Sequence, residues 1–231
     1  MSTYSPPEDL LQVSYASAEA ARPIISAPTV PWTVRLFEII VAAIALLITS
    51  PLILLTAIVI KLGTPGPALF RQVRLGANLK PFRFVKFRTL YADARQRFPE
   101  LYAYHYRDEE VKNLKFKVEN DPRVTPQGRW LRRSTLDELP NFWNVLTGDL
   151  ALVGPRPEIP EMLPYYQGDM LLKFTVRPGI TGLAQISGRG RLSFHETVQY
   201  DVEYVRGCSF KGDLKILLRT VWRIIRHDGA F

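Results

Sequence analysis

Two adjacent carboxylates, Asp137 and Glu138, are the strongest candidates for chemistry in this sequence. They stand in a 28-residue stretch, LRRSTLDELPNFWNVLTGDLALVGPRPE, that also contains the arginines Arg132, Arg133 and Arg156. Because a carboxylate normally repels a phosphate, attack by Asp137 on phosphorus requires nearby positive charge, which these arginines and a magnesium ion held partly by Glu138 could supply. Asp137 would then be a nucleophile that forms an acyl phosphate. Successive helical residues point about 100° apart, so the pair cannot flank one glycosidic bond as a glycosidase pair does.

The same carboxylates also fit a structural role at the start of a helix. Thr135 followed three residues later by Glu138 is a capping-box pattern, with the threonine as N-cap. Asp137 is the alternative N-cap, since Pro140 would then be the third helical residue, where the amide is unpaired anyway. We expect Thr135 to be the N-cap, because a nucleophile should keep its oxygens free. In both cases the carboxylates lie in the first helical turn, where the helix dipole favours their ionised forms and attracts anions.

Length and composition narrow the class of protein. The 231 residues suffice for one domain with a core and an accessory segment, and the net charge of +8 fits an anionic partner. One cysteine excludes an internal disulfide, and with three scattered histidines it argues against structural zinc. The sequence has no Gly-rich nucleotide-binding loop, so side chains must hold any bound phosphate. Because aromatic and basic residues lie close to an apolar segment, we expect the anionic partner to be membrane lipid, with no nucleic acid.

That apolar segment follows a Pro-, Ser- and Ala-rich stretch, residues 1–31, which we interpret as a flexible tail. Residues 39–60 are 22 residues without a charge, or about 33 Å as a straight helix, which is enough to cross a bilayer. Ser50-Pro51 lies near the centre, where the proline kinks or breaks a helix. The segment therefore either spans the membrane or bends and returns to the same face. Sequence physics alone favours spanning, because membrane helices tolerate proline.

The remaining pattern predicts an α+β domain that is mainly helical. Alternating apolar and basic residues around positions 76–78 predict a β-hairpin with one cationic face. Residues 89–118 are expected to be helical, and residues 193–206 form a second predicted helix with a serine cap at position 193. Residues 213–226 place leucines on one side and basic residues on another, which is typical of an interfacial amphipathic helix and equally of a helix packed on a core.

Five segments carry a resemblance to a known family: GTPGPALFRQVRLG, FRFVKFRTL, the LDELP to GPRPE block, RPGITGLAQISGR and DVEYV. They resemble the bacterial sugar transferases, or monotopic phosphoglycosyl transferases, which transfer a sugar 1-phosphate from a UDP-sugar to undecaprenyl phosphate. The resemblance implies that Asp137 is the nucleophile of a covalent phosphosugar intermediate, with UMP released. It places Mg²⁺ at Glu138. It also implies phosphate and nucleotide contacts from the basic residues Lys86, Arg132, Arg156 and Arg189.

The same resemblance implies a topology and a location. In this family the Ser50-Pro51 pair produces a re-entrant helix, so the expected division is a tail at 1–31, a re-entrant membrane helix at 32–62 and a cytosolic catalytic domain at 63–231. The protein would lie in the bacterial inner membrane with its site at the cytoplasmic face, and would initiate glycan assembly. The sugar and the oligomeric state stay open, and a homo-oligomer is compatible with the sequence. The alternative is a membrane-anchored basic adaptor without catalysis.

Overall fold

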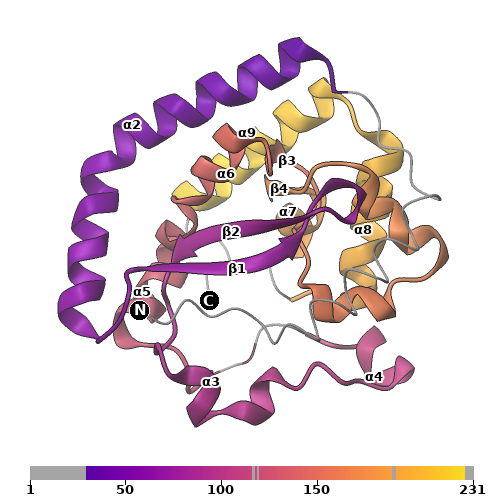
Figure 1. The fold of residues 1–231 in the computed structure, drawn as a ribbon. Helices are drawn as coiled ribbons and strands as arrows, with labels where there is room; N and C mark the ends of the chain where they lie inside the picture. Colours follow the sequence, from indigo (N-terminus) through magenta and orange to yellow (C-terminus); the bar gives the residue numbers. More distant parts are fainter. Residues whose placement is uncertain (1–29, 116–117, 119, 189–190, 227–231) are drawn as a thin grey trace.

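A computed structural model describes residues 30–115, 118, 120–188 and 191–226 (Figure 1). Most of the predicted tail lies outside these ranges. The predicted hairpin is confirmed: β1 (Leu69–Leu75) pairs antiparallel with β2 (Pro81–Phe87), with Leu69 opposite Phe87. The turn between the strands, η2 (Ala77–Leu79), has positive φ at Asn78 and at Leu79. A second, parallel pair joins β3 (Ala151–Val153) to β4 (Gly179–Thr181).

Helices and short 3₁₀ turns make up most of the rest, which confirms a mainly helical α+β fold. The α-helices after β2 are α3 (Ala94–Arg97), α4 (Asp108–Lys112), α5 (Pro126–Ser134), α6 (Asn141–Thr147), α7 (Leu183–Gly188), α8 (Phe194–Gly207) and α9 (Phe210–Ile225). The 3₁₀ turns are η3 (Pro99–Tyr102), η4 (Leu136–Glu138), η5 (Pro160–Tyr165) and η6 (Gly168–Thr175). The predicted helices at 193–206 and 213–226 are therefore confirmed.

The helix predicted over residues 89–118 is wrong. Within the described part of this segment, only α3, η3 and α4 are helical, and each is five residues or shorter. Pro99 interrupts any helix that would continue from α3, because it lacks an amide donor. The aromatic residues of the segment pack individually instead. The Tyr106 ring packs at an angle against the Tyr165 ring, with centroids 6.0 Å apart, and the Arg97 guanidinium lies 4.7 Å from the centre of the Tyr91 ring.

The long helix α2 (Trp32–Gly63) is bowed along one side of the molecule in Figure 1. It is long and apolar enough to cross a membrane, and only 11% of its most apolar window is buried, unlike the core helix of a soluble protein. Pro51 lies inside the helix and leaves the carbonyl of Leu47 without its usual amide donor. The Ser50 hydroxyl donates to that carbonyl at 2.8 Å. The Ser-Pro pair therefore satisfies the backbone that the proline disrupts.

Both ends of α2 are fixed to the same globular domain. Near its start, Arg35 donates to the Leu146 carbonyl at 3.0 Å, and the buried Glu38 forms an ion pair with Arg177 at 2.7 Å. Just after its end, the buried Arg88 donates to the carbonyl oxygens of Thr64, at 2.9 Å, and of Pro65. The middle of the helix instead exposes large apolar side chains, among them Ile44, Leu47, Ile48, Leu54 and Leu55.

Three groups of buried apolar residues form the core. The first half of α2 packs with α6, β3 and α9, in a group that contains Ala42, Val145, Leu152 and Ile216. The second half packs on the hairpin and α5, in a group around Ile60, Phe87 and Leu131. The third group joins the hairpin turn to η5, η6 and α8, and contains Leu79, Met162, Phe174, Phe194 and Val198. The hairpin contributes to all three groups and so lies between α2 and α8, as Figure 1 shows.

Candidate active site

Four elements bring the predicted site residues together. Strand β2 carries Lys86, α5 carries Arg132, η4 carries the two carboxylates, and the loop after β3 carries Arg156. β2 packs against η4, and η4 follows α5 directly in the chain. Lys86, Arg132 and Arg156 all act electrostatically on Asp137. The structure therefore assembles five of the predicted residues in one place, while Arg189 lies outside the described residues.

The backbone before the carboxylates differs from the expected helix start. Thr135 ends α5 in the left-handed conformation, with φ 58°, and its hydroxyl donates to the Ser134 carbonyl at 2.6 Å. Its side chain therefore caps no helix, and the predicted Thr135 cap is wrong. Asp137 is not an N-cap either. The carboxylates lie in a separate 3₁₀ turn, and α6 begins only at Asn141, because a left-handed residue turns the chain sharply after α5.

Asp137 is buried, with 7% of its surface exposed. Among the described residues, no group donates a hydrogen bond to its carboxylate or forms an ion pair with it. Burial and the neighbouring Glu138 raise the pKa of Asp137 to about 6, although Lys86, Arg156 and Arg132 act in the opposite direction. The carboxylate is thus ionised near neutral pH and has both oxygens free of direct protein partners.

Glu138 differs from its neighbour in having a direct cationic partner. The guanidinium of Arg156 donates to Glu138 Oε1 at 3.1 Å, and this carboxylate raises the pKa of Arg156. The Glu138 side chain is 23% exposed and the Arg156 side chain is 46% exposed, so the pair is accessible to a ligand. The two adjacent carboxylates are therefore distinguished by their surroundings, one unpaired and buried, the other paired and partly open.

The other two cations are held by specific contacts. Lys86 is half-buried, and its ammonium lies 5.7 Å from the centre of the Phe70 ring. Burial lowers the pKa of Lys86 to about 8, although Asp137 opposes the shift. Arg132 donates from Nε to Thr89 Oγ1 at 3.1 Å, and its Nη1 lies 3.9 Å from Asp121 Oδ2. A fixed guanidinium of this kind can bind phosphate oxygens without first being ordered.

Sequence reasoning did not include three residues that support this site. Asp121 is buried, accepts two hydrogen bonds from the Arg123 guanidinium, both at 2.9 Å, and lies beside Arg132. Thr89 holds Arg132 from β2's side, and Arg74 donates to the carbonyl of Pro157 at 3.1 Å. The basic alternation of the hairpin was a usable signal for Arg74. Thr89 lies in the segment FRFVKFRTL, but nothing in that segment indicates its contact with Arg132. Asp121 carries no sequence signal, because its role depends on contacts between distant segments.

Asp137 and Glu138 are also the candidate ligands of the predicted magnesium ion. Among the described residues no three His, Cys, Asp or Glu side chains gather as a complete protein ligand set. Mg²⁺ is commonly held by one or two carboxylates together with substrate phosphates and water, so a complete set is not required. Glu138, with one oxygen on Arg156, and the unpaired Asp137 fit that partial donor set.

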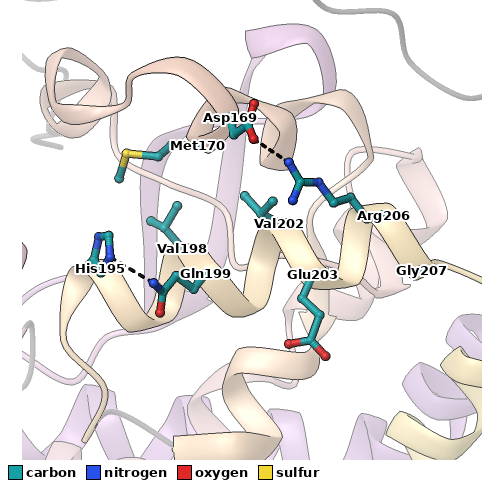
Figure 2. Close-up of a pocket in the computed structure, with 9 residues that line it drawn as sticks. All are labelled: Asp169, Met170, His195, Val198, Gln199, Val202, Glu203, Arg206 and Gly207. Carbon is teal, nitrogen blue, oxygen red and sulfur yellow. Dashed lines mark hydrogen bonds and ion pairs between the residues drawn. The ribbon is translucent and has the colours of Figure 1, made fainter.

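A groove of about 540 Å³ lies elsewhere, between η6 and α8 (Figure 2). Val198, Val202 and Met170 line it, and an ion pair between Asp169 and Arg206 crosses one end. At the other end, His195 hydrogen bonds to Gln199 at 3.0 Å on the exposed surface of α8. None of the predicted site residues lines this groove.

Comparison with known proteins shows that the chain belongs to the bacterial sugar transferase family, whose model matches residues 30–227. The galactosyl transferase CpsE of Streptococcus agalactiae is 42% identical over 166 residues, which are 71% of this chain and 36% of CpsE. EpsL of Bacillus subtilis, an uncharacterized sugar transferase, is 40% identical over 195 residues, which are 84% of this chain and 88% of EpsL. The UDP-glucose:undecaprenyl-phosphate glucose-1-phosphate transferase of Caulobacter vibrioides is 38% identical over 205 residues, or 85% of this chain and 71% of that protein.

The lengths of these relatives differ. The chain spans most of EpsL but little more than a third of CpsE, and 42% of an uncharacterized sugar transferase of Haemophilus influenzae. The family match nevertheless covers every element described above, from α2 to α9. Family membership therefore applies to the whole described fold, including the carboxylate site.

Proposed function

We propose that this protein transfers a sugar 1-phosphate from a UDP-sugar to undecaprenyl phosphate and thereby initiates the assembly of a bacterial glycan. Relatives named as undecaprenyl-phosphate galactose phosphotransferase, in Salmonella typhimurium, and as glucose-1-phosphate transferases support these two substrates. The sugar itself is not specified by the site, since galactose and glucose both occur among the names of relatives.

One observation carries the proposal: Asp137 is a buried carboxylate that has no direct partner among the described residues and on which three cationic side chains act electrostatically. A carboxylate that only stabilised the fold would be paired, because an unpaired buried charge is costly. Unpaired oxygens and surrounding positive charge are instead what an anionic electrophile needs. The diphosphate brings negative charge to the cations while its β-phosphorus approaches the free carboxylate.

The reaction then has two half-reactions. In the first, a carboxylate oxygen of Asp137 attacks the β-phosphorus, the new O–P bond forms, and the bond to the α-phosphate breaks with its electron pair leaving on UMP. In the second, a phosphate oxygen of undecaprenyl phosphate attacks the same phosphorus and Asp137 is released. The product is a sugar linked to the lipid by a diphosphate. Attack requires the ionised form of Asp137, which dominates above its pKa of about 6.

The cations divide the work of charge stabilisation. Lys86 lies close enough to Asp137 to interact with it electrostatically, and so can hold the β-phosphate against the nucleophile. Arg156, partly exposed, is free to contact the departing phosphate while it stays paired with Glu138. Arg132 and Arg189 are proposed as further phosphate and nucleotide contacts. A magnesium ion bound at Glu138 would supply additional neutralisation of the diphosphate.

We also propose that α2 is re-entrant and that the site faces the cytoplasm of a bacterial inner membrane. A helix that crossed the bilayer would carry its two ends to opposite faces, and about 48 Å of straight helix would separate them. Here the Glu38–Arg177 pair and the Arg88 contacts tie both ends to one domain, and the exposed apolar middle contains Ser50-Pro51. Such a helix can enter and leave by one leaflet.

The experiment is a screen of UDP-sugars with the purified protein and undecaprenyl phosphate, with UMP release as the measurement. Intact-protein mass after mixing with the active UDP-sugar alone should show an added phosphosugar, and Asp137→Asn should lack both the adduct and turnover while still binding membranes. We expect a loss of at least 10³-fold in turnover for that variant. Release of UDP would indicate transfer of the sugar without its phosphate, and no release with any UDP-sugar would favour a basic adaptor. An active Asp137→Asn variant would contradict the nucleophile assignment.

A further inference from the structure

A second cluster of charged residues is buried away from the reacting carboxylates. It consists of Glu158, Tyr166, Lys173 and Asp201, hereafter the buried network. Lys173 and Asp201 have side chains that are 3% and 1% exposed, and their charged atoms are 3.1 Å apart. The Lys173 ammonium also donates to the Tyr166 hydroxyl at 3.0 Å, and that hydroxyl donates to Glu158 Oε2 at 2.7 Å. The two hydrogen bonds link η6 to the loop after β3 through Tyr166, and the ion pair between Lys173 and Asp201 adds α8 to the network.

The network ends on the segment that carries Arg156. Glu158 is two residues further along the chain, and its other carboxylate oxygen accepts from the Ile159 amide at 2.9 Å. Its carbonyl accepts from the Leu75 amide at 2.8 Å, and the preceding Pro157 carbonyl accepts from Arg74 at 3.1 Å. The chain immediately after Arg156 is therefore held by the hairpin on one side and by the buried network on the other.

The chain before Arg156 is fixed in a different way. Gly154 and Pro155 bond to the β4 segment, from the Gly154 amide to the Thr181 carbonyl and from the Gly179 amide to the Pro155 carbonyl, both at 2.9 Å. A β-carbon on Gly154 would lie 2.4 Å from the Arg177 carbonyl oxygen, so only glycine permits this approach. Both flanks of Arg156 are thus rigid, and its side chain alone reaches across to Glu138.

A purely apolar cluster in place of the buried network would also stabilise the loop that carries Arg156. Tyr166 packs edge-on against Phe174 and Phe194, at 5.0 and 5.1 Å, within the largest apolar group of the core. Replacing buried ion pairs by apolar residues of similar volume is often neutral or stabilising. Directional bonds add what apolar packing does not: they fix one loop conformation.

We propose that the buried network positions Arg156 opposite Asp137, so that α8 contributes to catalysis without touching the substrate. The inference rests on the proposed function for its kinetic consequence, but its structural consequence is independent of it. The network residues are positioning residues, and their effect on turnover passes through the Arg156 guanidinium.

The test uses Tyr166→Phe, which removes only the hydroxyl that links Lys173 to Glu158 and leaves the ring packing in place. Val198→Ala is the matched control, because Val198 is buried in the same apolar group as Tyr166 and on α8, the helix of Asp201, but makes no network bond among the described residues. Lys173→Met provides a second, more disruptive variant. Hydrogen exchange of the full-length protein in detergent is measured by mass spectrometry over residues 152–158. The amides there should exchange several-fold faster in Tyr166→Phe and stay unchanged in the control.

A kinetic cycle then separates positioning from general destabilisation. Tyr166→Phe is combined with Arg156→Lys, which keeps a charge but loses the two-pronged guanidinium. Alone, Tyr166→Phe should lower kcat/KM for the UDP-sugar about tenfold, and in the Arg156→Lys background less than about twofold, because coupled residues are not additive. Val198→Ala should have the same effect in both backgrounds.

The exchange and kinetic measurements distinguish failure of the positioning role from failure of the proposed function. Equal effects of Tyr166→Phe in both backgrounds, or unchanged exchange over residues 152–158, would overturn the positioning role. If the wild-type protein turned over no UDP-sugar, the proposed function would fail, and the exchange result would still decide whether the network holds the loop.

Discussion

Two pairs of carboxylates in the same domain have opposite surroundings. Burial raises the pKa of both aspartates, but Asp137 has no direct partner among the described residues and its cations act from a distance, whereas Asp201 has the Lys173 ammonium 3.1 Å away. Each aspartate has a glutamate beside it in the comparison. Glu138, next to Asp137, forms an ion pair with a half-exposed arginine, whereas Glu158, in the network of Asp201, accepts a hydrogen bond from the hydroxyl of a buried tyrosine. The residue types are similar in both pairs, so pairing and access distinguish them.

This difference indicates what each pair contributes. A carboxylate whose charge is matched inside the protein stabilises one conformation and has little left to offer a ligand. An unmatched carboxylate destabilises the folded state until a ligand or a proton compensates it, and such strain is characteristic of active sites. Substitutions at the two pairs should therefore change stability in opposite directions.

The largest effect is expected at the matched pair. Lys173→Met leaves the buried Asp201 without its counter-charge, which should lower the free energy of unfolding by about 3–5 kcal/mol. Thermal unfolding followed by circular dichroism in detergent would measure it as a lowered Tm. The double variant Lys173→Met with Asp201→Asn removes both charges and should recover part of the loss. A single variant as stable as the wild type would contradict the assignment of a matched pair.

At the unmatched carboxylate, Asp137, a substitution that removes the charge should raise the free energy of unfolding instead of lowering it. The folded state raises the pKa of Asp137 from 3.8 to about 6, so the contribution of this carboxyl group to stability is highest at low pH and falls as pH rises through this range. Asn carries no charge to be buried. Asp137→Asn should therefore raise the unfolding free energy at pH 8 by on the order of 1–3 kcal/mol and change it little at pH 4. Unfolding curves at the two pH values measure the difference, and a variant less stable at pH 8 would contradict the unmatched charge.

Much of this arrangement was predictable from sequence. Period-two alternation predicted the hairpin, and helical periodicity with the serine at 193 predicted α8 and its cap. These signals are local, so a single stretch contains all of the information. The two carboxylates of the 28-residue stretch also meet Arg132 and Arg156 in space, because a short chain keeps them close, whereas Arg133 is exposed.

Features that depend on distant contacts were not predictable. The sequence contains a capping-box pattern at Thr135 and Glu138, but no capping box forms there. Thr135 instead ends α5 in the left-handed conformation, and the contacts that fix the end of α5 are not visible in the pattern. The segment 89–118 has helical composition but packs its aromatics against other elements one by one. The buried network joins residues 158 to 201, and nothing in the sequence marks Lys173 or Asp201 as partners. The roles assigned to the site residues are predictions that the experiments above would test.

The cations of the unmatched site also give a prediction for pH dependence. Burial lowers the pKa of Lys86 to about 8, so its charge is lost as pH rises above that value. Turnover should rise through the pKa of Asp137, about 6, and fall above about 8. Lys86→Arg keeps its charge at every working pH, so its profile should lack the alkaline decline. At pH 9 wild-type kcat/KM should be about tenfold below its maximum while the variant's is not. An identical decline in both proteins would assign it to another group.

The smallest predicted effect compares the two Ser/Thr-x-x-Glu patterns that precede the two sites. Ser193 accepts from the Glu196 amide at 3.2 Å and Glu196 accepts from the Ser193 amide at 2.8 Å, so α8, which carries Asp201, has a complete capping box. Thr135 has no such bond. Ser193→Ala should cost about 1 kcal/mol of unfolding free energy, and Thr135→Ala less than about 0.5 kcal/mol. Both are measured from the same thermal unfolding curves, and equal losses would mean that Thr135 caps a helix after all.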